Sequence, residues 1–402
     1  MRKYVTYLII LIVSACSSND VFDLETQHES TLSDAYEHVV KIAQEALGDI
    51  TLKSRANSVL SVESVTPWLT VDLQRDDYGN ARSAKDVFPD TLLYAVAFKN
   101  KAGSVLVSCN QLYEGPVAIL PQEYLGNCKD AMENEGFKLF VGLYCESVKN
   151  GHINKTFSED EFMPFLSKAL RYTSPESSDW ATVTDYPVKL IQKWGQRSPY
   201  NKYCFTADGK QALAGCLPVA FAQVLTYYKY PNTINGYKIY WSSTNCEKPT
   251  SAYQQDDVAR LIHELGVLCD AEYGVSSTKA PVKKMNLALT KMGYEYRYDS
   301  TQVAIHETMM IHNLAEYGPA LVYGAANLVS AHEWVIDGAL AQRRTIDGKS
   351  ELRFLYHCNW GWNGSQDGYF LSTAFNPYGD NSSPNYQFNY IVRPTYFIKK
   401  KN

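Results

Sequence analysis

A segment of small residues, residues 211–220, runs directly into a helical pattern and carries Cys216 at the junction. From residue 217 to residue 228 apolar side chains recur at steps of three and four, as one buried helix face requires. Pro218 fits only the first turn of such a helix, and Pro231 ends the pattern. The segment therefore predicts an amphipathic helix that begins at Cys216, and the fold must bury one face of it.

The position of Cys216 suits a reactive thiol. The start of a helix presents the positive end of the backbone dipole and unpaired N–H groups, which favour a thiolate. The same N–H groups can hold an oxyanion. The alternative is a buried structural cysteine, and this segment leaves both interpretations open.

The N-terminal residues are typical of a secretory signal. Arg2 and Lys3 precede an apolar run, residues 7–13, that is too short to span a bilayer. The run ends in residues 13–16, which resemble a bacterial lipobox, so residues 1–16 are expected to be a signal peptide cleaved before Cys16 and Cys16 to carry a lipid. Residues 17–30 then form a tether. We expect an exported lipoprotein at the cell surface or periplasmic face, with the lipid as its only membrane contact, and release of the mature form stays open. An ordinary signal peptide with an incidental cysteine is the alternative.

Composition excludes several classes of function. The chain has 402 residues, enough for two domains, and its net charge of −5 without a basic run argues against nucleic acid as a partner. None of the nine cysteines lies in a C-x-x-C pair, so neither a structural zinc site nor any other metal or cofactor is expected. Whether the cysteines form a disulfide bridge is left open, the candidates being Cys204, Cys246, Cys269 and Cys358.

The chain divides at a polar, proline-marked stretch, residues 172–185, which has the composition of an exposed, cleavable linker. The leading part, residues 31–171, has a helical stripe that ends at Gly48 and strand patterns at residues 92–98 and 104–108. The part that follows, residues 186–402, is helical at first and rich in strands from Pro319 onward. We expect an α+β protein with a smaller leading domain.

A thiol nucleophile needs a histidine as its base and a partner that orients the ring. Of the eight histidines, His332 alone opens a predicted strand, residues 333–337, after a pair of small residues. His357 lies within a strand among packing residues. The others are expected to be structural: His28, His38, His152, His263, His306 and His312.

Asn359 is the candidate orienter, and the hairpin after His332 decides it. A connection over residues 343–348 would place His332 directly opposite Asn359, with side chains roughly 5 Å apart. A tighter turn at Asp347 and Gly348 would place Asn359 opposite Ile336, away from the histidine. The register therefore tests the assignment.

Four blocks in order resemble the streptopain-type (C10) cysteine peptidases, which have a papain-like fold with a helical half and an antiparallel β half. The blocks are residues 194–201, 214–224, 331–338 and 356–370. The resemblance implies that Gln196 forms the oxyanion hole, Cys216 attacks and His332 is the base. It further implies that Asn359 and Trp360 orient and shield the histidine. Gln211 is the competing candidate for the oxyanion hole.

The resemblance extends weakly to a substrate-binding loop with Ser276 and Ser277, and to Ala331, where the family usually has glycine. It also implies that residues 31–171 are a pro-domain that inhibits the enzyme within the same chain until the linker is cut. The prediction is an endopeptidase acting on proteins or peptides. Two alternatives remain: a catalytically silent surface-binding protein on the same scaffold, and an amidase or transpeptidase of cell-wall peptides.

Overall fold

The computed structural model describes residues 36–50, 60–69, 91–110, 113–166, 179–326, 330–379 and 389–401. The predicted signal peptide, the tether, Cys16 and residues 172–178 of the predicted linker lie outside these ranges. Within the described part of the chain, no helix has both the length and the apolar character that crossing a bilayer requires.

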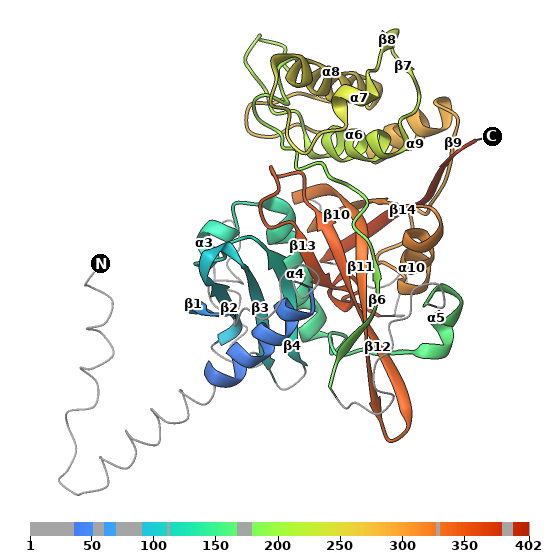
Figure 1. Ribbon diagram of the computed structural model, residues 1–402. Helices are drawn as coiled ribbons and strands as arrows, with labels where there is room; N and C mark the ends of the chain where they lie inside the picture. Colours follow the sequence, from blue (N-terminus) through green and yellow to red (C-terminus); the bar gives the residue numbers. More distant parts are fainter. Residues whose placement is uncertain are drawn as a thin grey trace, which may run out of the picture.

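One antiparallel sheet, 12-stranded over the described residues, organises the molecule (Figure 1). Along it the strands are β1 (Val62–Leu69), β2 (Thr91–Phe98), β3 (Gly103–Asn110), β4 (Tyr113–Pro121), β13 (Gly368–Leu371), β12 (Lys349–Asn359), β11 (Ser330–Ile346), β10 (Ala320–Ala326), β14 (Tyr390–Lys400) and β9 (Tyr294–Tyr298). Two further strands pair at its side, β5 (Phe157–Ser158) with β12 and β6 (Ala181–Tyr186) with β11. A separate pair is formed by β7 (Thr233–Ile234) and β8 (Tyr237–Lys238).

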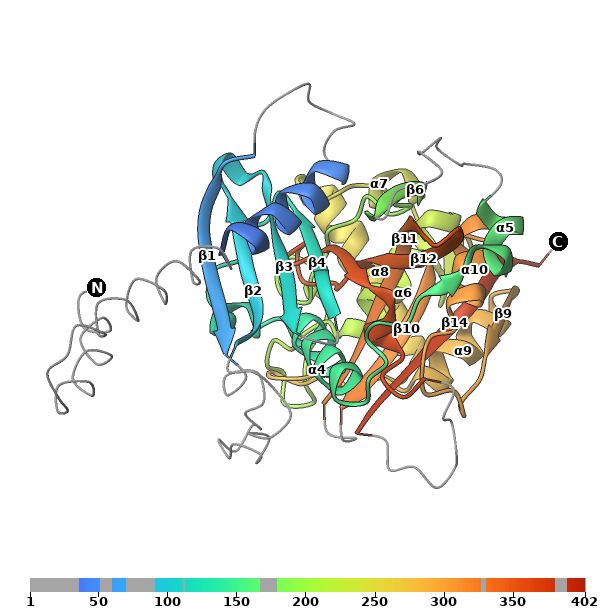
Figure 2. The same cartoon turned by 90° about the horizontal axis from the view of Figure 1, so that it is seen from below.

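The leading part has the predicted α+β pattern. The helical stripe becomes a helix over residues 36–50, whose Val39 and Leu47 pack against Val96 and Val105 of the predicted hairpin, now β2 and β3. Figure 2 shows this helix in blue, lying across β1 to β4. Three more helices follow, α3 (Cys128–Ala131), α4 (Glu135–Lys149) and α5 (Glu159–Leu166).

Helices of the second part gather at the top of Figure 1. They are α6 (Cys216–Tyr228), α7 (Trp241–Thr244), α8 (Ala252–Leu268) and α9 (Val282–Lys291), while α10 (Glu307–Glu316) lies beside β10 and β14. The predicted helix from Cys216 is confirmed as α6, and its apolar face joins a core with α8 and with Leu321 and Val335 of the sheet. The α+β class and the helical and β halves are confirmed.

The two parts of the chain share one core and one sheet. β4 pairs directly with β13, and the α4 rings of Phe137 and Phe140 contact Phe370. The end of the predicted linker is a strand, since β6 pairs with β11 over residues 339–343. The remaining short helical turns are η1 (Lys99–Lys101) and η2 (Ser372–Phe375).

Candidate active site

Cys216 is the first residue of α6, and a strained turn brings it there. Gly215 has φ +92, and a Cβ at this position would lie 2.9 Å from Thr278 Cγ2, so the turn needs glycine on both counts. Leu213 N–H donates to the Gly274 carbonyl, and the Thr278 hydroxyl donates to the Leu213 carbonyl. The loop from Gly274 to Thr278, which carries the exposed Ser276 and Ser277, therefore lies beside the turn that leads to the thiol.

Gln196 lies on the adjoining loop. Its backbone carbonyl accepts a hydrogen bond of 2.9 Å from Ala214 N–H, two residues before Cys216, and its side chain is buried. The amide of the competing Gln211 donates instead to the carbonyls of Asn201 and Cys204. These bonds tie Gln211 to a neighbouring turn, and the role of Gln196 as the oxyanion donor stays a prediction.

Burial keeps the thiol neutral in this structure. It raises the pKa of Cys216 to about 11, although the N–H of Glu333 donates to the sulfur and the start of α6 adds the N–H groups of Leu217 and Cys216. The nearby Glu135 carboxylate raises it further. The expectation that the helix start alone favours a thiolate is wrong for this state, because desolvation outweighs the backbone N–H groups.

His332 lies on the opposite side of β11 from α6. Its Nε2–H donates to the Trp360 carbonyl at 2.8 Å, its ring stacks on Trp334, and Nδ1 has no hydrogen-bond partner. Trp334 belongs to the core around α4, whereas Val335 faces α6. The neighbouring Ala331 is exposed.

The first turn of α4 covers the histidine. A Cβ at Gly136 would lie 2.5 Å from Trp360 Cε3 and 2.8 Å from His332 Cδ2, so only glycine lets the helix backbone approach these rings. Asn134 caps α4 and anchors it, because its amide donates to the Ser365 carbonyl and to Gln366 Oε1. A segment of the leading part thus occupies the space next to the candidate base.

No hydrogen bond joins the Cys216 thiol to the His332 ring, both of which the structure describes. Burial lowers the pKa of His332, against the opposing effects of the Trp360 carbonyl and the Glu135 carboxylate. Both groups are therefore neutral near pH 7, and the predicted ion pair is not formed in this state.

The register that would place Asn359 opposite His332 is wrong. The hairpin turns at Asp347 and Gly348, whose φ values of +50 and +74 suit a tight two-residue turn. A bulge at residue 337 then moves Asn359 opposite Val335. Length and composition of the connection did not fix this, because a longer and a shorter turn fit the same residues.

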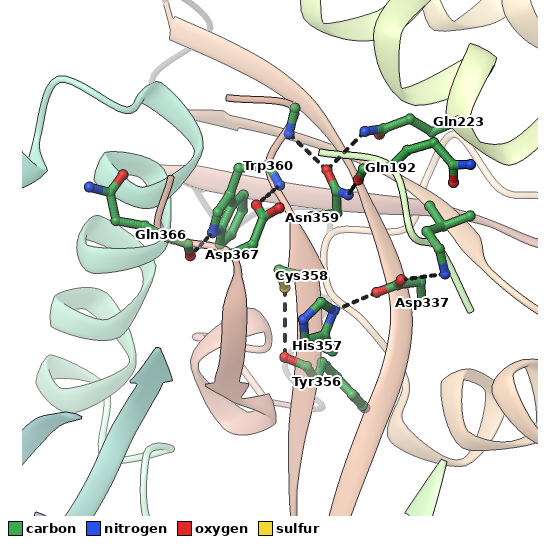
Figure 3. Close-up of polar contacts among 12 residues, drawn as sticks. Gln192, Gln223, Asp337, Tyr356, His357, Cys358, Asn359, Trp360, Gln366 and Asp367 are labelled. Atoms are coloured by element: carbon green, nitrogen blue, oxygen red, sulfur yellow. Dashed lines mark hydrogen bonds and ion pairs between the residues drawn. The ribbon is translucent and has the colours of Figure 1, made fainter. Parts of the chain in front are cut away.

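Asn359 instead holds a buried network, shown in Figure 3. Its amide donates to the Gln192 carbonyl at 2.6 Å, and its Oδ1 accepts from Gln223 Nε2 and from Gly361 N–H, each at 3.1 Å. Gln223 comes from α6, so Asn359 connects the Cys216 helix with the start of the Trp360 segment. Its predicted role as the orienter of His332 stays a prediction.

Trp360 is fully buried and bonded at three points. Its indole N–H donates to the Gln366 carbonyl, its backbone N–H donates to Asp367 Oδ1 at 2.9 Å, and its carbonyl accepts from His332. Burial raises the pKa of Asp367 to about 7, although the Trp360 N–H opposes this. The indole packs at 6.5 Å from the His332 ring, centroid to centroid.

His357 is an ion-pair residue, which the sequence did not indicate. Its Nδ1 lies 2.6 Å from Asp337 Oδ1, while Asp337 Oδ2 accepts from Leu190 N–H (Figure 3). Burial opposes the charged ring, but the Asp337 carboxylate raises the pKa of His357. The sequence did not predict this ion pair because it depends on the bulge at residue 337, which turns Asp337 toward the neighbouring strand.

Sequence reasoning also missed Asn134 and Gly136 at the site, and Glu333 beside the thiol. An asparagine three residues before a phenylalanine, with glycine between, signals a helix start but not what the helix covers. Glu333 stood out only as a charge within an apolar strand. Over the described residues, no cluster of three or more histidine, cysteine or acidic side chains is arranged to hold a metal ion.

Comparisons with known proteins found similar sequences and a similar fold. The model of the peptidase C10 family matches residues 194–252 and 240–370. Streptopain from Streptococcus pyogenes is 27% identical over 292 residues, which cover 62% of this chain and 67% of that protein. A thiol protease/hemagglutinin, PrtT, from Porphyromonas gingivalis is 23% identical over 207 residues, covering 46% of this chain and 23% of that protein. A solved fragment of prointerpain A from Prevotella intermedia has a TM-score of 0.51 at 19% identity and covers 77% of this chain and 96% of its own, which supports the fold.

Proposed function

Because the chain is a cysteine endopeptidase of the peptidase C10 family, we propose that it is made as a zymogen held inactive by its own leading part, residues 31–171. The observation that carries the proposal is the first turn of α4, packed on the rings of His332 and Trp360. In this arrangement the base and the nucleophile are both present, and a helix of the leading part keeps them from pairing.

The chemistry follows once His332 reaches the thiol. Its imidazole takes the proton of Cys216, and the thiolate adds to the scissile carbonyl of a peptide. The Gln196 amide and the Cys216 N–H stabilise the oxyanion, each donor contributing roughly 3 kcal/mol. The imidazolium then protonates the leaving amine, and water deprotonated by His332 hydrolyses the thioester. Asn359 orients the ring, Trp360 shields it, and the loop with Ser276 and Ser277, together with Ala331, borders the substrate.

Maturation requires a cut between α5 and β6. β6 pairs with β11 from residue 181 onward, and the Trp180 ring lies 4.4 Å from the Arg353 guanidinium carbon and 4.7 Å from that of Arg344. These contacts hold the segment to the catalytic part, so the cleaved bond lies on the N-terminal side of Trp180. The cut alone does not expel α4, since β4 remains paired with β13. Further cleavage or dissociation of the leading part completes activation.

Export and anchoring belong to the same proposal. Residues 1–16 act as a lipoprotein signal and Cys16 carries the lipid, so the precursor reaches the outside of the cytoplasmic membrane before it is cut. Protein or peptide substrates meet it there.

The test compares Cys216→Ala and His332→Ala with Cys246→Ala, which removes a partly exposed cysteine outside the site. Wild type and the Cys246→Ala control should convert the precursor and digest a denatured protein at internal bonds, and the other two should do neither. Mass spectrometry of the new amino terminus locates the cut. Hydrolysis by Cys216→Ala would refute the proposal. Processing of a cell-wall peptide alone would favour the amidase or transpeptidase, and no reaction with any substrate or thiol-directed probe would favour the silent binding protein.

A further inference from the structure

A buried carboxyl group beside the nucleophile has no role in the chemistry above. Glu333 follows His332 on β11, its backbone N–H donates to the Cys216 sulfur, and only 2% of its surface is exposed. Its Oε2 has no hydrogen-bond partner, and no described lysine or arginine forms an ion pair with it. A buried carboxyl oxygen without a hydrogen-bond partner costs free energy. An unpaired buried group next to the thiol is therefore a candidate for a role in binding.

The side chain of Glu333 belongs to a row that leads from the thiol toward the surface. Tyr323 of β10 lies directly opposite Glu333, and Arg393 of β14 lies opposite Tyr323, so the three share one face of the sheet. This is the face that Val335 turns toward α6. Tyr323 and Arg393 are partly exposed, and the Arg393 Nε–H donates to the Gln302 carbonyl and not to Glu333. The row therefore offers an aromatic ring and a free carboxyl oxygen.

We propose that Glu333 recognises a lysine or arginine side chain of the substrate close to the scissile bond, an inference that rests on the proposed peptidase activity. A peptide bound with its carbonyl at Cys216 places its neighbouring side chains within reach of residue 333. A cationic group there supplies the partner that the carboxyl lacks, and a charge-assisted hydrogen bond in a site of low polarity is strong. The Tyr323 ring adds a surface on which the cation can stack.

The resting state of Glu333 agrees with this role. Burial raises its pKa well above the usual range, so the empty site holds a neutral carboxylic acid. Binding of a basic side chain displaces that proton to solvent. The preference for basic over neutral substrates should therefore rise with pH, whereas a purely structural glutamate would leave it constant.

The experiment uses the matured enzyme and paired peptides that differ at one position near the cut, lysine or arginine against norleucine. Wild type should show a kcat/KM higher by about 10- to 100-fold for the basic member at one position. Glu333→Gln should lose this preference and its pH dependence while cutting the norleucine peptide within about threefold of wild type. Glu264→Gln serves as a control, because Glu264 is also buried but is already bonded to Asn235.

Glu333→Ala provides a second variant if the glutamine form folds poorly, as judged by its melting temperature. It should shift the preference toward apolar side chains. An unchanged basic preference in either variant, or a wild-type preference for apolar residues at every position, would overturn the role of Glu333 and leave the peptidase assignment intact. Absence of cleavage by wild type would instead overturn the peptidase assignment and this inference with it.

Discussion

The site has a thiol side around Cys216 and a histidine side around His332, and different parts of the chain build them. The hydrogen bonds of the thiol side lie within the catalytic part: the α6 start, the Gly215 turn and the loops at Gln196 and Gly274 are bonded to one another, and the leading part acts on the thiol through the charge of Glu135. The histidine side is completed by the leading part, through α4 and its Asn134 cap. In the proposed zymogen, latency therefore depends mainly on the packing of the histidine side, which maturation has to rearrange.

The largest expected effect is on the reactivity of Cys216. In the precursor its pKa of about 11 leaves very little thiolate at pH 7, and pairing with His332 should make most of it thiolate. Since a thiolate of lower pKa is a weaker nucleophile, the net gain in alkylation rate on maturation is about 100-fold. Peptide mapping after timed exposure to iodoacetamide measures this, with Cys246 as internal reference. Equal alkylation rates before and after maturation would mean that maturation does not change the reactivity of the Cys216 thiol.

Asn359 tests whether the two sides share a residue. Asn359→Ala should lower kcat of the matured enzyme by about 100-fold if the residue also orients His332, because a misplaced base loses about that much. Gln223→Ala is the control, since it removes one partner of the same buried network and costs a similar ~1–3 kcal/mol of stability. Steady-state kinetics and thermal melting separate the two effects. An equally large loss of kcat in Gln223→Ala would show that Asn359 acts only through the packing of the buried network.

Gly136 tests the contact that defines the histidine side. Gly136→Ala places a methyl group 2.5 Å from Trp360 Cε3, so α4 must move away, at a cost of about 1–3 kcal/mol. We expect the precursor to mature about tenfold faster, in line with an energy of that size. Gly48→Ala is the matched control, because a Cβ there meets nothing within 4 Å. The measurement is the rate at which the precursor band disappears on a gel. A rate equal to that of Gly48→Ala would show that the α4 contact does not keep the precursor inactive.

The same comparison explains how much the sequence could predict. The α6 start, the β2–β3 hairpin and the strands of the β half follow from local patterns, because a helix face or a strand alternation is written in neighbouring residues. The position of Cys216 in the site followed in the same way. The cover over His332 did not, because Gly136 and His332 are brought together only by packing between the two parts of the chain.

The register error has a comparable cause. Whether a hairpin turns in two residues or six depends on which pairing buries more side chains, and the bulge at residue 337 is retained by the Asp337 carboxylate bonding to His357 and to Leu190 N–H. These partners are 20 and 147 residues away in sequence. The neutral thiol was missed for the same reason, since its burial depends on the packed surroundings of α6.

The smallest expected effect concerns Asp367, which supports the histidine side through the Trp360 N–H. Burial raises its pKa from 3.8 to about 7, so the folded protein binds a proton that the unfolded chain releases at lower pH. Its contribution to stability is complete below pH 4 and is lost as pH rises through about 7, which should lower the melting temperature over that range. Asp367→Asn keeps an oxygen acceptor for the Trp360 N–H but cannot titrate, so its melting temperature should fall less between pH 4 and pH 7. The ion pair of His357 with Asp337 lies nearby, and both residues are retained in the variant. Parallel pH profiles of the two melting temperatures would show that Asp367 does not titrate in this range, and that the histidine side is supported by a carboxylate already charged in acid.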